Sequence, residues 1–297
     1  MMACVASPSP HDPRARPIGV FDSGVGGLTV LHELLVALPR EDFLYLGDTA
    51  RFPYGERSPE ELTRFSAEIA EELLRRRVKL LVVACNSATA AALPALQRRM
   101  METTLGVEVL GVVRPEALRA VATTRTGRIG LLATPTTVAS GAYERAVHAV
   151  DPHVTLHAVP SPTLAPLIQA GERFDERTVN AVREVCAPLR HAEVDTVILG
   201  CTHYPLISPL LQRLLGPGVT LVSSGAALAR QVEHALSTRG LAASAHAEDR
   251  DGEWGEGEYR FLCTGDVEAF RELGTRFLQM PLGEIEQIQL APVEVLA

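Results

Sequence analysis

An internal repeat is the sequence feature that most constrains the fold. Residues 127–147 (GRIGLLATPTTVASGAYERAV) resemble residues 16–34 (RPIGVFDSGVGGLTVLHEL). Residues 195–215 (DTVILGCTHYPLISPLLQRLL) likewise resemble residues 79–100 (KLLVVACNSATAAALPALQRRM). The two later segments occur in the same order along the chain as the two earlier segments that they resemble. We therefore expect two copies of one architecture.

The offset between the two copies is nearly constant. Ile129 follows Ile18 by 111 positions, and Cys201 follows Cys85 by 116. Each copy alternates short apolar segments, such as PIGVF and KLLVVAC, with longer amphipathic ones, such as LTVLHELLVALP. Alternation of strands and helices at these lengths is typical of a doubly wound α/β fold with mainly parallel sheets.

The length of 297 residues favours two domains, each large enough to bury a core. We predict a disordered N-terminal tail over 1–16, a first domain over 17–110 plus 223–297, and a second over 111–222. The two domains are pseudo-symmetric, so equivalent strand ends form opposite walls of an interdomain cleft. Ligands of open α/β sheets bind beyond the carboxyl ends of the strands. The active site is therefore predicted in this cleft.

Charge and composition exclude several classes of protein. A net charge of −8 argues against nucleic acid as the primary partner. No apolar stretch approaches the ~20 residues that cross a bilayer, and residues 1–16 lack the apolar core of a signal peptide. We expect a cytoplasmic protein without a membrane partner. The five cysteines form no C-x-x-C pair, which indicates reduced thiols and no metal site.

Cys85 and Cys201 are the candidate catalytic residues. Each ends an apolar strand and precedes polar residues that suit the start of a helix. A helix N-terminus stabilises a thiolate, so we predict that the pKa of each thiol is lowered toward neutrality. The alternative is two buried cysteines without a chemical role. Their equivalent positions in the two copies favour catalysis.

Two thiols on opposite walls suit inversion of an α-carbon without a cofactor. Such a reaction removes a proton from one face and delivers another to the opposite face. Asp22, at the end of the first strand, and His203, two residues after Cys201, are candidates to tune the pKa values of these thiols. Both also suit structural roles: Asp22 can cap a turn, and His203 can bond a backbone carbonyl. We predict no metal and no cofactor.

Short polar residues at the other strand ends are predicted to bind the carboxylates of a small-molecule substrate. These are Ser23, Asn86, Ser87, Thr134, Thr137 and Thr202. Tyr54 and Gly55, in a loop after the second strand, are candidates for the mouth of the cleft.

Other motifs fit poorly. A dinucleotide fingerprint would need a small residue where Thr29 stands, neither cysteine is followed by the arginine of a phosphatase loop, and a dithiol redox couple would need C-x-x-C.

Four segments in this order, DSGVGGLTV, YLGDTARFPYG, VVACNSATA and LGCTHYPL, resemble the signature segments of the glutamate racemase family, within the aspartate/glutamate racemase superfamily. The resemblance runs from about Pro17 to the C-terminus. It implies cofactor-independent conversion of L-glutamate to D-glutamate for peptidoglycan, with Cys85 and Cys201 as catalytic residues. It also implies substrate contacts by Asp22, Ser23, Tyr54, Gly55, Asn86, Ser87, Thr202 and His203, and by the threonine pair Thr134 and Thr137.

The sequence departs from the family at three places. Ser87 stands where threonine is usual, Ser223 where aspartate is frequent, and Arg114-Pro115-Glu116 where Glu-Pro-Gly is common. The last puts a cation where a carboxylate is often found, which leaves the contacts near that loop open.

Two other functions remain as alternatives. A racemase of the same superfamily acting on aspartate would differ by one substrate methylene, which discriminates by only ~1 to 3 kcal/mol. A catalytically silent amino-acid-binding protein is disfavoured by the retention of both thiols. A homodimer is expected, since this is the commonest closed assembly.

Overall fold

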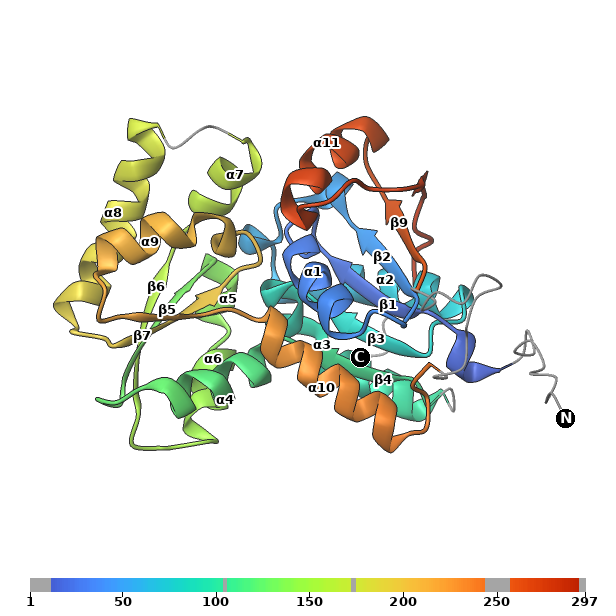
Figure 1. Cartoon of the computed structure of the whole chain (residues 1–297), viewed down its shortest axis with the longest axis horizontal. Helices are drawn as coiled ribbons and strands as arrows, with labels where there is room; N and C mark the ends of the chain where they lie inside the picture. The colour runs from blue at the N-terminus through green and yellow to red at the C-terminus, as the bar shows by residue number, and fades with distance from the viewer. Residues whose placement is uncertain (1–11, 104–105, 172–174, 244–256, 294–297) are drawn as a thin grey trace, which may run out of the picture.

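The computed structural model describes residues 12–103, 106–171, 175–243 and 257–293. Two α/β units lie side by side, each built on its own parallel sheet (Figure 1). The first sheet contains β1 (Ile18–Asp22), β2 (Phe43–Gly47), β3 (Leu80–Val83), β4 (Glu108–Gly111), β9 (Tyr259–Cys263) and β10 (Ile285–Gln287). The second contains β5 (Arg128–Ala133), β6 (Thr155–Pro160), β7 (Thr196–Gly200) and β8 (Thr220–Val222).

The strand orders of the two sheets confirm the repeat. The first sheet has the order β10-β9-β2-β1-β3-β4 and the second β6-β5-β7-β8, so β5 to β8 repeat the arrangement of β1 to β4. The register repeats as well. Ile18 lies opposite Leu80, and Ile129 opposite Thr196, which are the same pairs shifted by 111 and 116 positions. The predicted doubly wound α/β class is confirmed.

Both faces of the first sheet are covered by helices, which is why its central strands are apolar throughout. Ile18 and Val20 face one core and Phe21 the other, as expected for alternating side chains. The helices on the Ile18 face are α1 (Leu28–Ala37), α10 (Gly225–Thr238) and α11 (Val267–Leu278), and those on the Phe21 face are α2 (Pro59–Arg75) and α3 (Asn86–Glu102).

The second sheet is covered in the same way. On one face its core is continuous with that of α1, α10 and α11, which joins the two units through packed apolar side chains. The helices on that face are α7 (Leu164–Gln169), α8 (Glu176–His191) and α9 (Ser208–Leu215). Those around the other face are α4 (Val113–Thr123), α5 (Pro135–Ala139) and α6 (Ala142–His148).

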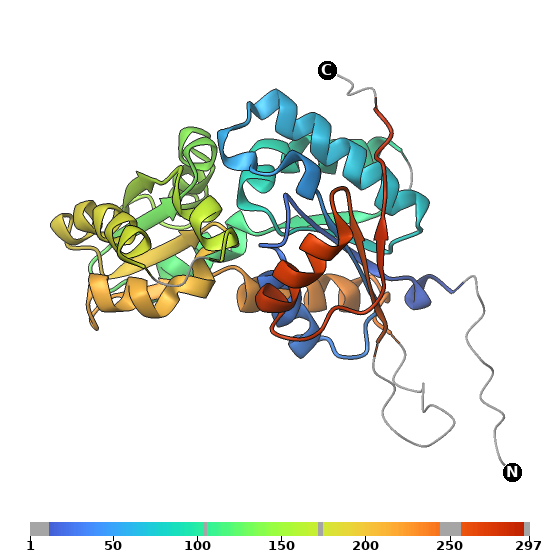
Figure 2. The same ribbon diagram turned by 90° about the horizontal axis from the view of Figure 1, so that it is seen from above.

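Figure 2 shows the second unit on the left of the first, with α10 running under the first unit after the chain returns from β8. Every strand of the second sheet comes from residues 128–222. The domain boundaries at 110/111 and 222/223 stay predictions.

Residues 12–16 were predicted as part of a disordered tail, and the structure differs there. Pro13–Ala15 form a 3-10 helix capped by the Asp12 side chain, which accepts from the Arg14 backbone N–H at 2.9 Å. The buried Lys79 Nζ donates to the Arg14 carbonyl oxygen at 2.6 Å and fixes this segment on the first domain. Residues 1–11 of the predicted tail lie outside the described residues.

Within the described ranges, no helix is both long and apolar enough to span a bilayer.

Candidate active site

A pocket lies where the carboxyl ends of strands from both sheets meet. It holds about 440 Å³ of space, counting solvent at its mouth. Residues from the first domain and from the second line it together, as the repeat predicted. They are Ser23, Phe52, Pro53, Tyr54, Gly55, Glu56, Cys85, Asn86, Ser87, Thr134, Pro135, Ser161, Pro162, Ala165, Pro166, Cys201, Thr202 and His203.

Cys85 lies at the start of a helix, as predicted. It follows β3 and is the N-cap of α3, and its Sγ accepts from the Ala88 backbone N–H at 3.5 Å. Only 5% of the residue is exposed. Its thiol therefore stands on the first-domain wall of the pocket with helix amides behind it.

Cys201 follows β7 on the second-domain wall, but the predicted α-helix start is wrong here. A 3-10 helix, Tyr204–Ile207, comes first, and α9 begins only at Ser208. An α-helix capped at Cys201 would need the N–H of residue 205 to bond the Cys201 carbonyl oxygen, and Pro205 has none. The Tyr204 N–H bonds that carbonyl instead, at 3.1 Å.

The predicted lowering of the thiol pKa values is also wrong. Burial raises the pKa of Cys85 to about 12, and the negative charge of Asp22 adds to the rise, while bonds from Ala88 and Ser23 oppose it. Burial raises the pKa of Cys201 as well, further than that of Cys85. Desolvation of a thiolate outweighs the field of one helix end. Both thiols are neutral near pH 7.

His203 lies against Cys201. Its Nδ1 is 3.8 Å from the Cys201 Sγ, and its Nε2 is 3.0 Å from Oε1 of Gln169. The ring packs between Phe52 and Phe277, with centroid distances of 5.5 and 5.2 Å. Burial, together with the positive charge of Arg276, lowers the pKa of His203 to about 3. The imidazole is therefore neutral, and with Nε2 donating to the Gln169 oxygen its Nδ1 is an acceptor toward Cys201.

Asp22 lies behind the pocket wall and does not line the pocket. Its carboxylate accepts from the Gly24 N–H at 3.0 Å and from Thr202 Oγ1, in the other domain, at 3.3 Å. Burial raises its pKa to about 6, against the effect of these bonds. Asp22 thus ties the turn after β1 to the turn after β7, and a catalytic or substrate-binding role stays a prediction.

Three hydroxyls form a closed triangle across the domain boundary. Ser87 Oγ lies 2.9 Å from Thr134 Oγ1 and 3.0 Å from Thr137 Oγ1, and the two threonine oxygens are 2.9 Å apart. Ser87 and Thr134 line the pocket, whereas Thr137 stands behind them. The family's usual threonine is thus replaced by a serine whose hydroxyl bonds both partners.

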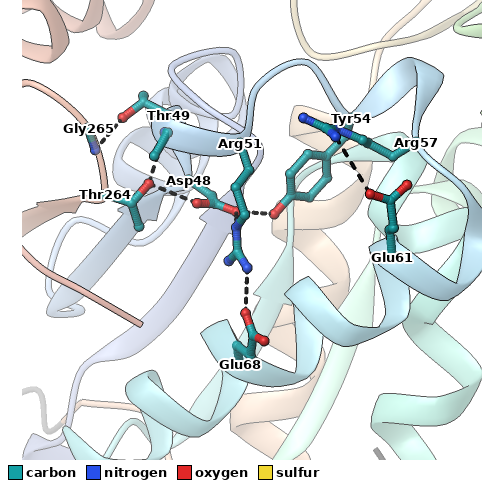
Figure 3. A network of polar contacts seen from close by, with 10 residues as sticks. Asp48, Thr49, Arg51, Tyr54, Arg57, Glu61, Glu68, Thr264 and Gly265 are labelled. Atoms are coloured by element: carbon teal, nitrogen blue, oxygen red, sulfur yellow. Dashed lines mark hydrogen bonds and ion pairs between the residues drawn. The ribbon is translucent and has the colours of Figure 1, made fainter. Parts of the chain in front are cut away.

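A buried network holds the loop that carries Tyr54, and Figure 3 shows how its members converge on Asp48. Arg51 Nε donates to the Asp48 carboxylate at 2.6 Å, and Thr264 Oγ1 at 2.8 Å. The Tyr54 hydroxyl donates to the same carboxylate, and Arg51 also bonds Glu68 on α2. Tyr54 lines the pocket as predicted, but its hydroxyl is committed to Asp48. The ring shapes the wall.

Glycines let the two walls approach closely. A Cβ on Gly55 would stand 2.7 Å from the Cβ of Thr134, and one on Gly26 would stand 2.4 Å from Thr202 Oγ1. Thr136 Oγ1 donates to the Gly55 carbonyl oxygen at 2.9 Å, which fastens the Tyr54 loop to the second domain.

Sequence reasoning missed several residues. Ser161 follows β6, a strand that it did not identify, although β6 is the counterpart of β2 and could have been found by extending the repeat. No sequence pattern pointed to Gln169.

The residues at two departures from the family pattern lie outside the pocket lining. Arg114 and Ser223 are both exposed and do not line the pocket, whereas Glu116 is buried beside Asn86.

Across the described ranges, no group of three or more His, Cys, Asp or Glu side chains is placed to hold a metal ion.

Comparison with known proteins identifies the family. A family model described as Asp/Glu/Hydantoin racemase matches residues 21–232. A glutamate racemase from Geobacter metallireducens is 42% identical over 275 residues, covering 93% of this chain and 97% of that protein. The chain belongs to the glutamate racemase family.

Solved structures of this racemase family show the same fold. A glutamate racemase isoform from Bacillus anthracis has a TM-score of 0.84 at 36% identity, covering 93% of this chain and 98% of its own. A Francisella tularensis glutamate racemase in complex with D-glutamate has a TM-score of 0.83 at 30% identity, with the same coverage. The two-domain arrangement is therefore that of glutamate racemases.

The thiol pKa values give a testable pH dependence. Because alkylation requires the thiolate, and the pKa of Cys85 is about 12, its rate in the substrate-free protein should rise about tenfold per pH unit up to pH ~9 without a plateau. The rate is measured with iodoacetamide by mass spectrometry of the Cys85 peptide. A plateau near pH 7 would show a thiolate already formed and contradict the effect of burial.

Proposed function

We propose that this chain interconverts L- and D-glutamate without an added cofactor, with Cys85 and Cys201 as the two acid/base groups. One observation carries the proposal: one thiol from each domain lines the same pocket, at equivalent strand ends of the repeat. The relatives and solved structures named above, all glutamate racemases, support it.

The substrate carboxylates would bind to hydroxyls and backbone amides of the pocket. Ser23, Ser87 and Thr134 line it with hydroxyl groups, and α3 begins there with the backbone N–H groups of its first turn, whereas the Thr202 hydroxyl already donates to Asp22. Thr137 orients Ser87 and Thr134 from behind. Donors of this kind suit anions.

In the proposed mechanism, the thiolate of one cysteine takes the α-proton and the thiol of the other delivers its own proton to the opposite face. The electron pair of the broken C–H bond is held by the substrate and then forms the new C–H bond. Each turnover leaves the protonation states of the cysteines exchanged, and the reverse reaction restores them. The same residues therefore serve both enantiomers.

Forming a thiolate in this buried pocket needs compensation, because burial raises both thiol pKa values. We propose that the ammonium group of the bound substrate supplies it, since a positive charge beside a thiolate stabilises the charged form. His203 would orient the Cys201 thiol by accepting its S–H hydrogen bond at Nδ1. Asp22 would act as a positioning residue through its bond to Thr202.

Glutamate is proposed as the substrate rather than aspartate because the matching relatives carry that name and the Francisella tularensis structure holds D-glutamate. The D-glutamate formed would supply peptidoglycan synthesis, as the family resemblance implies. A homodimer and a cytoplasmic location stay predictions.

The first test uses pure protein in deuterated water without added cofactor. L-glutamate should become D-glutamate that carries deuterium at the α-carbon, and L-aspartate should react at least ~10-fold more slowly, within the discrimination expected of one methylene. Circular dichroism follows the inversion and mass spectrometry the label. Faster turnover of aspartate than of glutamate would identify the protein as an aspartate racemase. If neither substrate exchanged its α-proton, the racemase proposal would fail and an amino-acid-binding protein would remain.

The second test removes each thiol. Cys85→Ala and Cys201→Ala should each lower kcat/KM for racemisation by at least ~100-fold, because each removes one of two acid/base groups. Each variant should still exchange the α-proton of one enantiomer only, and the two variants should differ in which. Cys186→Ala is the matched control, since Cys186 is buried on α8 away from the pocket. Near-normal racemisation by either pocket variant would rule out the two-cysteine mechanism.

A further inference from the structure

A cluster of polar side chains lies directly behind Asn86. Glu116 on α4 and Tyr143 on α6 are buried, with exposed fractions of 0% and 1%. Neither lines the pocket, whereas Asn86 at the start of α3 does. The cluster thus joins a pocket residue of the first domain to two side chains of the second.

The hydrogen bonds in the cluster have one consistent direction. Asn86 Nδ2 donates to Tyr143 Oη at 2.6 Å and to Glu116 Oε2 at 3.2 Å. The Tyr143 hydroxyl donates to the same Glu116 oxygen. The NH₂ side of the Asn86 carboxamide therefore faces Glu116 and Tyr143, which do not line the pocket. Asn86 Oδ1 is buried and has no partner among the described residues.

We propose that Glu116 and Tyr143 are positioning residues that hold the Asn86 carboxamide with its oxygen toward the pocket, where it accepts a hydrogen bond from the ammonium group of bound glutamate. This inference rests on the proposed function and deepens it. The pocket hydroxyls and helix amides suit the carboxylates, and the ammonium group needs an acceptor instead. Asn86 Oδ1 is an unpartnered acceptor on a residue of that pocket.

The reverse orientation of the amide is unfavourable on both sides. It would place Oδ1 against Glu116 Oε2, an acceptor, and against a Tyr143 hydroxyl whose hydrogen is already donated to that oxygen. It would also turn the NH₂ group toward a positively charged ammonium.

The protonation state of Glu116 does not change this orientation. Burial of Glu116 raises its pKa to about 8, against bonds from Tyr143, Ser224 and Asn86. The carboxyl is largely neutral near pH 7, and Oε2 accepts in either state.

The test compares variants of the full-length protein by steady-state racemisation and by inhibition with glutarate, which is glutamate without its amino group. Glu116→Leu removes the acceptor, and Glu116→Gln retains one. Tyr143→Phe removes the other partner and carries the test if Glu116→Leu fails to fold. Glu41→Gln is the control, because Glu41 is also a buried carboxylate, paired with Lys79; both residues precede β2 and β3, at the strand ends opposite those that carry the pocket.

In Glu116→Leu the KM for L-glutamate should rise about tenfold with kcat changed less than about threefold, because one charged hydrogen bond common to ground and transition states is lost. The inhibition constant of glutarate should stay within about twofold of the wild-type value. Tyr143→Phe should show a smaller KM rise, and Glu116→Gln and Glu41→Gln should show none.

Two results would overturn the inference: an unchanged KM in Glu116→Leu and Tyr143→Phe, or glutarate inhibition weakened by the same factor as glutamate binding. The latter would mean general damage to the pocket. If the wild-type protein racemised no amino acid, the proposed function itself would fail, and that failure is visible before any variant is made.

Discussion

The active site depends on the close packing of strand-end turns from two copies of the same fold. The turn after β1 meets the turn after β7, where Gly26 leaves no room for a side chain beside Thr202, and Thr202 donates to Asp22 across the boundary. A second contact joins the Tyr54 loop to the second domain through Gly55 and Thr136. These contacts close the pocket around the two thiols. Any loosening of them would separate the walls and change the distance over which a proton must move.

Closing the pocket has an electrostatic consequence. Removal of water makes the charged state of a buried group costly, which raises the pKa of Cys85 to about 12 and lowers that of His203 to about 3. Both thiols and the His203 imidazole are therefore neutral near pH 7. In the proposed mechanism, the bound amino acid brings a positive charge to where a thiolate must form, which would link binding to activation. This arrangement would keep the thiols unreactive until the substrate is present.

Much of the architecture could be predicted from the sequence, because strand ends are marked by apolar runs followed by polar residues. The repeat predicted two copies of one α/β architecture, and it placed Cys85, Ser87, Thr134 and Cys201 on one cleft, where the structure has them. The α-helix start after Cys201 failed because Pro205 has no N–H to donate, whereas two other failures depend on three-dimensional burial. The thiol pKa values were predicted in the wrong direction because a helix end is visible in a sequence, whereas the depth of a side chain is not. For the same reason the sequence did not reveal that Asp22, which is at a strand end like the others, lies behind the pocket wall.

The central claim is that two thiols act from opposite faces of one α-carbon. It is tested most directly by following α-deuterated L-glutamate in ordinary water and measuring the label in D-glutamate formed during the first few per cent of reaction. We expect product free of deuterium from the start, because the new proton comes from the thiol on the opposite wall and the deuterium stays on the first thiol. Early product that retains the deuterium would show that one group both removes and returns the proton, and would contradict it.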